Sequence, residues 1–262
     1  MSHFDVIVAG CGALGSAALY HLTRRGYSAL ALDRFPPGHN RGSSHGETRV
    51  IRQAYFEHPD YVPMLIDAYK LWEALAEESG EPLYQQTGVL QIGAEDGIVI
   101  PGVLNSAATH DLPITRLTRD ELVRAHPGFE LPEGFQALRE DRGGYLRVED
   151  CIRAHVRLAE RAGASTIIGE SILSWSATTQ GVSVQTDRNR YSAGALIVTA
   201  GAWAGQLLSI LTDKLTVQRK HLHWFANSDE HYRQDHGAPV FFYEIDNRCF
   251  YGFPQINEQG VK

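Results

Sequence analysis

Continuous apolar runs and helical periodicity alternate at the start of the chain. Residues 6–9 and 29–33 are apolar runs rich in β-branched and aliphatic side chains, as is typical of buried strands. Between them, residues 13–25 have the spacing of a helix that ends near Gly26. The first 33 residues therefore predict a strand, a helix and a second strand.

The same patterns predict further elements along the chain. Helices are expected at 61–79, 97–110, 119–125, 150–162 and 204–211, the third of them opened by a capping box between Thr118 and Glu121. Strands are expected at 87–93, 165–169, 172–178, 182–186 and 191–199, the last of them buried, and the aromatic segment 241–253 is expected to form one or two strands.

A glycine motif joins the first strand to the first helix. Gly10 permits a tight turn, Gly12 allows close approach of a pyrophosphate, and Gly15 allows the helix to pack on the strand. Asp33, at the end of the second strand, has the spacing of an acceptor for ribose hydroxyl groups. An acid there disfavours the 2′-phosphate of NADP. These residues predict a bound dinucleotide and leave NAD and FAD open.

Composition and charge exclude several classes of protein. The chain has 262 residues, 43% of them hydrophobic, and a net charge of −7. A basic block is absent from the sequence, so nucleic-acid binding is not expected. The longest apolar runs are too short to cross a membrane. A start that lacks a signal peptide and an odd number of scattered cysteines predict a cytoplasmic protein without disulfides.

Metal binding is not expected either. His221 and His223 alternate as on one face of a strand, but carboxylates and cysteines do not stand at useful spacing from them. Cys11 is expected inside the glycine turn because it is small.

The order of elements predicts an α/β protein with a discontinuous cofactor domain. The two segments with a nucleotide-binding pattern are separated by a mixed segment. We therefore expect a cofactor domain at 1–80 and 145–215, and a substrate domain at 81–144 and 216–262, incomplete at its C-terminal end.

Residues 42–55, GSSHGETRVIRQAY, form a far more specific pattern than the glycine motif. This block resembles the family of monomeric sarcosine oxidases and N-methyltryptophan oxidases. Further segments match this family in order along the entire chain: 61–63, 87–90, 197–203, 251–254 and 260–262.

The resemblance implies an FAD enzyme that oxidises a secondary amino acid, either N-methylated or cyclic. Its fold would be a Rossmann-like FAD-binding domain of the glutathione-reductase and D-amino-acid-oxidase type with an inserted mixed-sheet substrate domain. The amine becomes an imine, water hydrolyses the imine, and oxygen is reduced to hydrogen peroxide. The expected partners are an amino-acid substrate and oxygen, and the enzyme would be a monomer.

The resemblance also assigns roles to single residues. Arg52 would hold the substrate carboxylate, a task suited to a planar bidentate donor. Arg49 would lie beside the flavin and favour its reduced anionic form, and Lys262 would activate oxygen. Tyr251 would line the substrate pocket. Arg49 and Arg52 are three residues apart and would share one face of a helical turn.

The predicted cofactor-binding residues combine the glycine motif with positions that match the family: Gly10, Gly12, Gly15, Asp33, Arg34, Ser43, His45, Thr48, Arg49, Ile172, Gly201 and Trp203.

The chain also departs from the family pattern. Family members continue past the position of Lys262, and that part carries the cysteine that is covalently linked to the flavin. Ser44 stands where a second histidine is usual, and Glu47 where aspartate is usual. The sequence is therefore expected to be the N-terminal two thirds of such an enzyme, with FAD bound weakly and without a covalent bond. The alternatives are a flavin amine dehydrogenase, a D-amino-acid-oxidase-like enzyme, a nicotinamide dehydrogenase or an inactive FAD-binding fragment.

Overall fold

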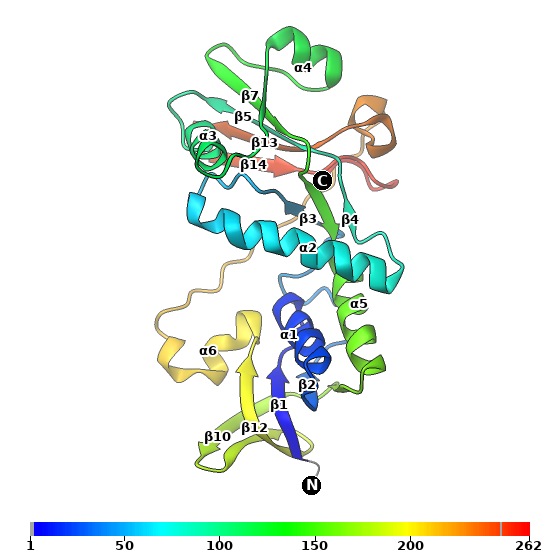
Figure 1. Cartoon of the computed structure of the whole chain (residues 1–262), viewed down its shortest axis with the longest axis vertical. Helices are drawn as coiled ribbons and strands as arrows, with labels where there is room; N and C mark the ends of the chain where they lie inside the picture. The colour runs from blue at the N-terminus through cyan, green and yellow to red at the C-terminus, as the bar shows by residue number, and fades with distance from the viewer. Residues whose placement is uncertain (1–2, 247) are drawn as a thin grey trace. The chain divides into compact units, whose positions relative to one another are not determined.

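The chain begins with the strand–helix–strand unit that its sequence predicts (Figure 1). The computed structural model describes residues 3–246 and 248–262. These residues cluster into two compact units. Unit 1 comprises Met1–Glu47, Glu78–Leu83 and Arg147–Lys220, and unit 2 comprises Thr48–Glu77, Tyr84–Leu146 and His221–Lys262.

The sheet of unit 1 has the strand order β10-β11-β12-β1-β2-β9. Strands β12, β1, β2 and β9 run parallel, and β10 and β11 extend the sheet in antiparallel fashion. The bounds of its elements are β1 (His3–Ala9), α1 (Ala13–Arg24), β2 (Ala29–Asp33), α5 (Val148–Arg161), β9 (Ser165–Ile168), β10 (Ile172–Thr178), β11 (Gly181–Thr186), β12 (Arg190–Val198) and α6 (Ala204–Leu207).

Helices α1 and α5 lie side by side in unit 1 (Figure 1). At their contact, the rings of Tyr20 and His155 are 5.3 Å apart, and the Ser16 hydroxyl lies 3.4 Å from Nδ1 of His155. Burial, and to a lesser extent the charge of His21, lowers the pKa of His155 to about 4. His155 is therefore neutral in the folded protein at pH 7.

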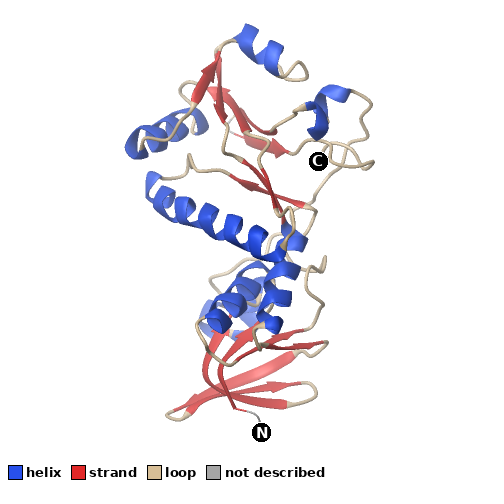
Figure 2. Cartoon of the chain, turned by 45° about the vertical axis from the view of Figure 1, so that its right-hand side comes forward, coloured by secondary structure: helices blue, strands red, loops and turns tan. Residues whose placement is uncertain are grey.

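Unit 2 is built on a mixed sheet with the order β14-β13-β5-β7-β6, and a smaller sheet has the order β3-β8-β4. Figure 2 draws the strands of the chain in red and the helices in blue. The bounds of the remaining elements are β3 (Thr48–Ile51), α2 (Val62–Ser79), β4 (Tyr84–Gln85), β5 (Val89–Ala94), α3 (Val99–His110), β6 (Thr115–Leu117), α4 (Arg119–Ala125), β7 (Phe135–Glu140), β8 (Gly144–Arg147), β13 (Val240–Ile245) and β14 (Arg248–Gly252).

Two buried carboxylates fix the segments that cross one face of the larger sheet. Glu244 in β13 accepts hydrogen bonds from the backbone N–H groups of Ile98 and Val99, at the N-terminus of α3. Glu140 in β7 accepts hydrogen bonds from the N–H groups of Gln53 and Ala54. Burial raises the pKa of Glu140, and these backbone donors oppose the shift. The loop after Arg52 is therefore held on the sheet.

The predicted elements agree with the structure except in four places. The strand at 190–198 is central in its sheet, but only Ala193 is buried, because the other described elements leave much of its two faces uncovered. The helix expected at 204–211 ends at Leu207, where Leu208 adopts an extended backbone and a 3-10 turn follows.

The other two differences concern candidate site residues. Arg49 lies in β3, and Arg52 directly follows that strand, so the two arginines do not share a helical face as expected. Residues 48–51 are extended because they pair with β8. His221 and His223 lie outside regular secondary structure, with ring centroids 6.3 Å apart.

The expected cofactor domain and unit 1 overlap but are not identical. Residues 48–77 were expected in the cofactor domain and cluster with unit 2. The assignment of one domain to the cofactor and the other to the substrate stays a prediction.

Candidate functional site

The glycine turn after β1 has no room for side chains at two of its three glycines. Gly10 has a φ of +98°, and a Cβ there would lie 2.6 Å from the carbonyl oxygen of Thr199. A Cβ on Gly15 would overlap the carbonyl oxygen of Gly10. The Thr199 hydroxyl donates a 2.7 Å hydrogen bond to that same carbonyl, so the residue that directly follows β12 fixes the turn.

Gly12 differs from the other two because the space beside it is open. Among the described residues, a Cβ there would meet only the Ser44 hydroxyl, at 3.7 Å. Ser44 in turn accepts a hydrogen bond from the N–H of Ala13, in the first turn of α1. The absent side chain of Gly12 therefore leaves room for a ligand at the N-terminus of the helix, where backbone N–H groups favour a phosphate.

Asp33 is fixed by the backbone around it. Its carboxylate accepts hydrogen bonds from the N–H of Cys11, at 2.6 Å, and from the N–H of Phe35, at 2.9 Å. The next side chain, Arg34, donates a 2.8 Å hydrogen bond to the Ser171 hydroxyl. The acid is thus held at the end of β2, one strand away from the glycine turn, as ribose recognition requires.

A pocket of about 400 Å³ opens at the carboxyl ends of the parallel strands of unit 1. This is the edge at which open α/β sheets bind ligands, and the volume suits a cofactor. Its lining contains most of the predicted FAD-binding residues, namely Gly10, Gly12, Asp33, Arg34, Ser43, Ile172, Gly201 and Trp203. Gly15 packs beneath the turn, and His45, in the same unit, is not among the lining residues.

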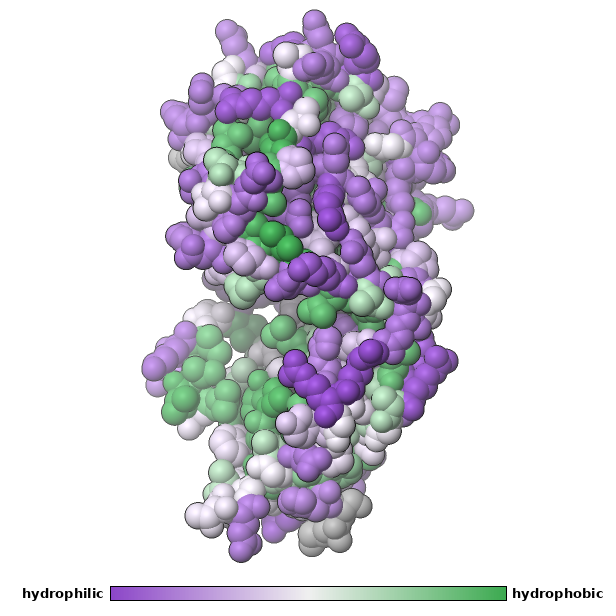
Figure 3. Space-filling model, in the orientation of Figure 1, coloured by the Kyte–Doolittle hydropathy of each residue, from purple (hydrophilic) through white to green (hydrophobic). Residues whose placement is uncertain are grey.

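The pocket also contains residues that sequence reasoning missed: Phe35, His39, Ser44, Glu170 and Thr199. Thr199 could have been identified from the sequence, because it ends a predicted strand and stands just before Gly201. The others lie in loops or at a strand end, where the sequence has no periodicity. Figure 3 shows hydrophobic side chains gathered over α6, whose last residue, Leu207, also lines the pocket.

In unit 2, Arg52 is a buried cation with an unused donor. Its side chain is 9% exposed and its Nη2 donates a 2.8 Å hydrogen bond to Glu57. The guanidinium lies over the rings of Tyr55 and Phe56, at 4.1 and 4.8 Å from their centroids. Nη1 is buried and has no hydrogen-bond partner among the described residues. Because buried donors are normally satisfied, this atom points to a missing acceptor.

Lys262 and Thr48 meet in the same unit. The Lys262 ammonium donates to the Thr48 hydroxyl at 2.9 Å and to the Thr48 carbonyl at 3.2 Å. It also lies 4.7 Å from the ring centroid of Phe253 and 5.6 Å from that of Trp224. Rings at these distances attract a cation through their π faces. Arg49, the next residue after Thr48, is half-buried.

Tyr251 presents its ring on the surface of unit 2. The side chain is 51% exposed and stacks on Phe242, directly opposite it on β13, with 6.1 Å between ring centroids. Phe242 in turn lies 5.4 Å from Phe56, one of the rings under Arg52. An aromatic row thus leads from Tyr251 to the buried arginine, and Tyr251 is not plain core.

The parallel sheet, the glycine turn, the acid at the end of β2 and the pocket are together the features of a dinucleotide-binding protein. The pocket fits the ADP half of FAD, because Gly12 leaves open space where a pyrophosphate would lie and Asp33 offers a fixed acceptor. The family model for FAD dependent oxidoreductases matches residues 5–261, and the chain belongs to this family.

Relatives narrow the class further. The chain is 38% identical over 263 residues to the monomeric sarcosine oxidase of Streptomyces avermitilis, covering 97% of this chain and 67% of that protein. It is 36% identical over 256 residues to N-methyl-L-tryptophan oxidase of Yersinia pestis, covering 97% of this chain and 68% of that protein. The chain thus spans about two thirds of the length of these relatives. The predicted resemblance, the FAD cofactor and the oxidoreductase class are confirmed.

Solved structures confirm the fold class. NikD, described as an unusual amino acid oxidase essential for nikkomycin biosynthesis, has a TM-score of 0.80 at 22% identity, covering all of this chain and 68% of NikD. Glycine oxidase from Geobacillus kaustophilus has a TM-score of 0.74 at 17% identity, covering all of this chain and 72% of that protein. None of the helices within residues 3–246 and 248–262 has the length and hydropathy needed to cross a membrane.

Proposed function

We propose that this protein oxidises the amine of a secondary amino acid, N-methylated or cyclic, with FAD as cofactor and oxygen as the final electron acceptor. The proposal is supported by relatives named monomeric sarcosine oxidase and N-methyl-L-tryptophan oxidase. For an N-methyl substrate, the amine, oxygen and water would yield the demethylated amino acid, formaldehyde and hydrogen peroxide. The chemistry that FAD supplies when bound is acceptance of a hydride from the carbon beside the nitrogen.

The observation that carries the proposal is the unused Nη1 of Arg52. A guanidinium has five N–H donors in a fixed fork, and a carboxylate accepts two of them side by side. Glu57 occupies only one edge of the fork, so the substrate carboxylate would take the other. Anchoring that carboxylate would fix the amine and the carbon to be oxidised in one orientation.

The other predicted residues have supporting roles in this proposal. The aromatic row of Tyr251 and Phe242 would cover the apolar part of the substrate. Lys262, held by Thr48, is proposed to supply the positive charge that stabilises superoxide as oxygen is reduced. Arg49 is proposed to favour the reduced anionic cofactor through its charge. Both cations would act by electrostatics and not by proton transfer.

The remaining FAD contacts are proposals as well. Gly10, Gly12, Gly15 and Asp33 would hold the pyrophosphate and the adenine ribose, and Arg34, Ser43, Ile172, Gly201 and Trp203 would line the same cofactor. His45 and Thr48 would contact the flavin half. We further propose a cytoplasmic monomer, supported by the name of the Streptomyces relative and by the free cysteines Cys11, Cys151 and Cys249.

A peroxide assay tests the proposal. The purified protein, saturated with FAD, is incubated in air with sarcosine, N-methyl-L-tryptophan or pipecolate, and with glycine as the primary-amine control. We expect peroxide from at least one secondary amine, in equal amount to the amine consumed, and little from glycine. Turnover with an artificial dye but without peroxide would indicate a dehydrogenase. A protein that binds NADH and not FAD would refute the cofactor assignment.

A further inference from the structure

The loop at 38–47 forms one wall of the cofactor pocket and has no regular secondary structure. Gly38, His39, Gly42, Ser43 and Ser44 all line the pocket. A loop loses conformational entropy at each of its residues when it is ordered, and this loss opposes binding. The pocket therefore needs contacts that fix this wall before the cofactor arrives.

The C-terminal end of the loop has an unusual backbone. Gly46 and Glu47 are consecutive residues with positive φ, +94° and +68°. Glu47 is one of few residues other than glycine with this conformation in the described chain, and its side chain makes the conformation unfavourable. Such a backbone persists only where its surroundings hold it.

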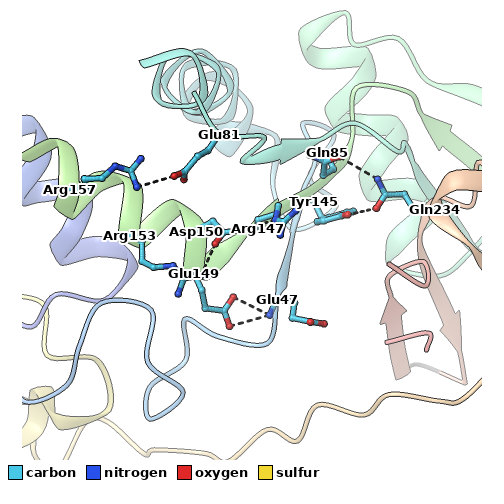
Figure 4. Close-up of polar contacts among 10 residues, drawn as sticks. All are labelled: Glu47, Glu81, Gln85, Tyr145, Arg147, Glu149, Asp150, Arg153, Arg157 and Gln234. Carbon is cyan, nitrogen blue, oxygen red and sulfur yellow. Dashed lines mark hydrogen bonds and ion pairs between the residues drawn. The ribbon is translucent and has the colours of Figure 1, made fainter. Parts of the chain in front are cut away.

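The carboxylate of Glu149 supplies that hold (Figure 4). Its Oε1 accepts a 2.6 Å hydrogen bond from the N–H of Gly46, and both oxygens accept from the N–H of Glu47, at 3.2 and 3.1 Å. In return, the N–H of Val148 donates to the carbonyl of Glu47 at 3.2 Å. One carboxylate thus gathers two successive backbone donors, as anions do in turns of this kind.

The first turn of α5 also supports the other end of the loop. Gly38, with a φ of +77°, packs on this turn so closely that a Cβ would lie 3.3 Å from the Cβ of Glu149 and 2.5 Å from Nη1 of Arg153. Ile152, in the next turn of α5, lines the pocket itself. Both ends of the loop therefore pack on the first two turns of one helix, and all these residues belong to unit 1.

We propose that Glu149 is a positioning residue for FAD, which fixes the pocket wall at 38–47 through its hydrogen bonds to Gly46 and Glu47. Glu149 itself is not among the lining residues of the pocket, so it would act through the loop. The proposal rests on the FAD cofactor and is independent of which amine the protein oxidises. Without this carboxylate, FAD binding must order the loop, and the affinity falls accordingly.

The test compares Glu149→Gln with Glu81→Gln. The glutamine keeps the size of Glu149 but loses its charge and one of its two acceptor oxygens. Glu81 also pairs with α5, through a 2.9 Å ion pair with Arg157, but does not touch the loop, so it is the matched control (Figure 4). A third variant, Glu149→Asp, retains the carboxylate on a shorter side chain.

Two measurements on each variant need no amine substrate. Hydrogen exchange in the FAD-free protein follows the amides of Gly46 and Glu47, and quenching of FAD fluorescence gives the Kd. For Glu149→Gln we expect exchange of these two amides to accelerate at least tenfold and the Kd to rise at least tenfold, while the amides of β1 keep their protection. For Glu149→Asp, the exchange rates of the two amides and the Kd should lie between those of Glu149→Gln and the wild type. For Glu81→Gln, both quantities should equal those of the wild type.

Several outcomes would overturn the proposal. The first is an unchanged Kd for FAD in Glu149→Gln, and the second is an equal rise of the Kd in Glu81→Gln. The third is faster hydrogen exchange of the β1 amides together with those of the loop, which would indicate general unfolding. Failure of the wild type to bind FAD would remove this proposal and the cofactor assignment together. Normal FAD binding without peroxide from any amine would refute only the proposed reaction, so the two failures are distinguishable.

Discussion

The ammonium of Lys262 donates hydrogen bonds to both the hydroxyl and the carbonyl oxygen of Thr48, a residue 214 positions earlier in the chain. Thr48 is buried, with 1% of its surface exposed, so its hydroxyl is a fixed acceptor. The contact holds the proposed oxygen-activating cation against the start of β3. It therefore gives Thr48 a role in orienting Lys262 that can be tested directly.

Replacing Thr48 by valine should slow the reaction with oxygen. The change removes the hydroxyl acceptor but keeps the shape, and a single hydrogen bond is worth about 0.5–1.5 kcal/mol, or up to about tenfold in rate. Thr48→Ser retains the hydroxyl and should react nearly as the wild type. Mixing the reduced enzyme with oxygen in a stopped-flow instrument measures this rate. Equal rates for the two variants would mean that the hydroxyl does not orient Lys262.

Arg52→Met should weaken binding of the amino acid without unfolding the protein. Loss of a charged hydrogen-bonding partner costs about 1.5–3 kcal/mol, which corresponds to a rise in KM of roughly ten- to hundredfold. Arg52→Lys should recover only part of this, since an ammonium cannot bind a carboxylate with a planar fork. The exposed Arg116, in the same unit, provides the control variant Arg116→Met. Steady-state kinetics checks the result, and an unchanged KM in Arg52→Met would place the carboxylate elsewhere.

Gly12→Ala and Gly15→Ala should fail in different ways. At Gly12 a Cβ meets only the Ser44 hydroxyl among the described residues, so the alanine variant should fold normally and lose FAD affinity. At Gly15 the Cβ overlaps the Gly10 carbonyl, so that variant should lose stability before any ligand is added. Thermal unfolding without FAD, followed by an FAD titration, separates the two effects. A stable Gly15→Ala protein would contradict the close packing of α1 on the turn.

Stability should fall in mild acid because of His155. Burial lowers the pKa of His155 to about 4, while the unfolded chain takes up the proton near pH 6.5. Between these values the unfolded state binds more protons, so the free energy of unfolding is greatest above pH 6.5 and decreases as the pH falls toward 4, by at most about 1.4 kcal/mol per pKa unit. Urea denaturation at several pH values measures the slope.

The variant His155→Asn tests whether His155 causes this change in the free energy of unfolding with pH, here called the slope. Asparagine does not titrate, so the part of the slope that comes from His155 should disappear. The exposed His221→Asn change is the control and should keep the slope of the wild type. The buried His126, whose pKa burial also lowers to about 4, should leave a residual slope in His155→Asn. An unchanged slope in His155→Asn would contradict this explanation.

FAD should bind this chain without a covalent bond. A covalent thioether requires a reactive thiolate, and burial raises the pKa of Cys11 and of Cys151 to about 12. The thiol of Cys249 is exposed, and its pKa is also raised, chiefly by desolvation. Precipitation with acid should therefore release all the flavin into the supernatant. Yellow colour that stays with the precipitated polypeptide would disprove this expectation.

Elements with local signals could be predicted from the sequence. The capping box of Thr118 and Glu121 is present in the structure, and β2 has the bounds that its apolar run predicts. The helix after Trp203 was predicted too long, because its residues are good helix formers and only the tertiary structure makes Leu208 extended. The prediction of a helical turn at Arg49 and Arg52 was wrong because pairing with β8 overrides a three-residue spacing.

The glycine turn, the acid at the end of β2 and the family could be predicted from the sequence alone, since they depend on the types and spacing of neighbouring residues. The partners of the proposed site residues are known only from the three-dimensional fold. It brings Lys262 to Thr48, Glu149 to Gly46 and Glu47, and Glu140 to the loop after Arg52. These partners are 87 to 214 residues apart, and strand register and helix packing bring them together. The positions of these residues along the sequence do not predict such contacts.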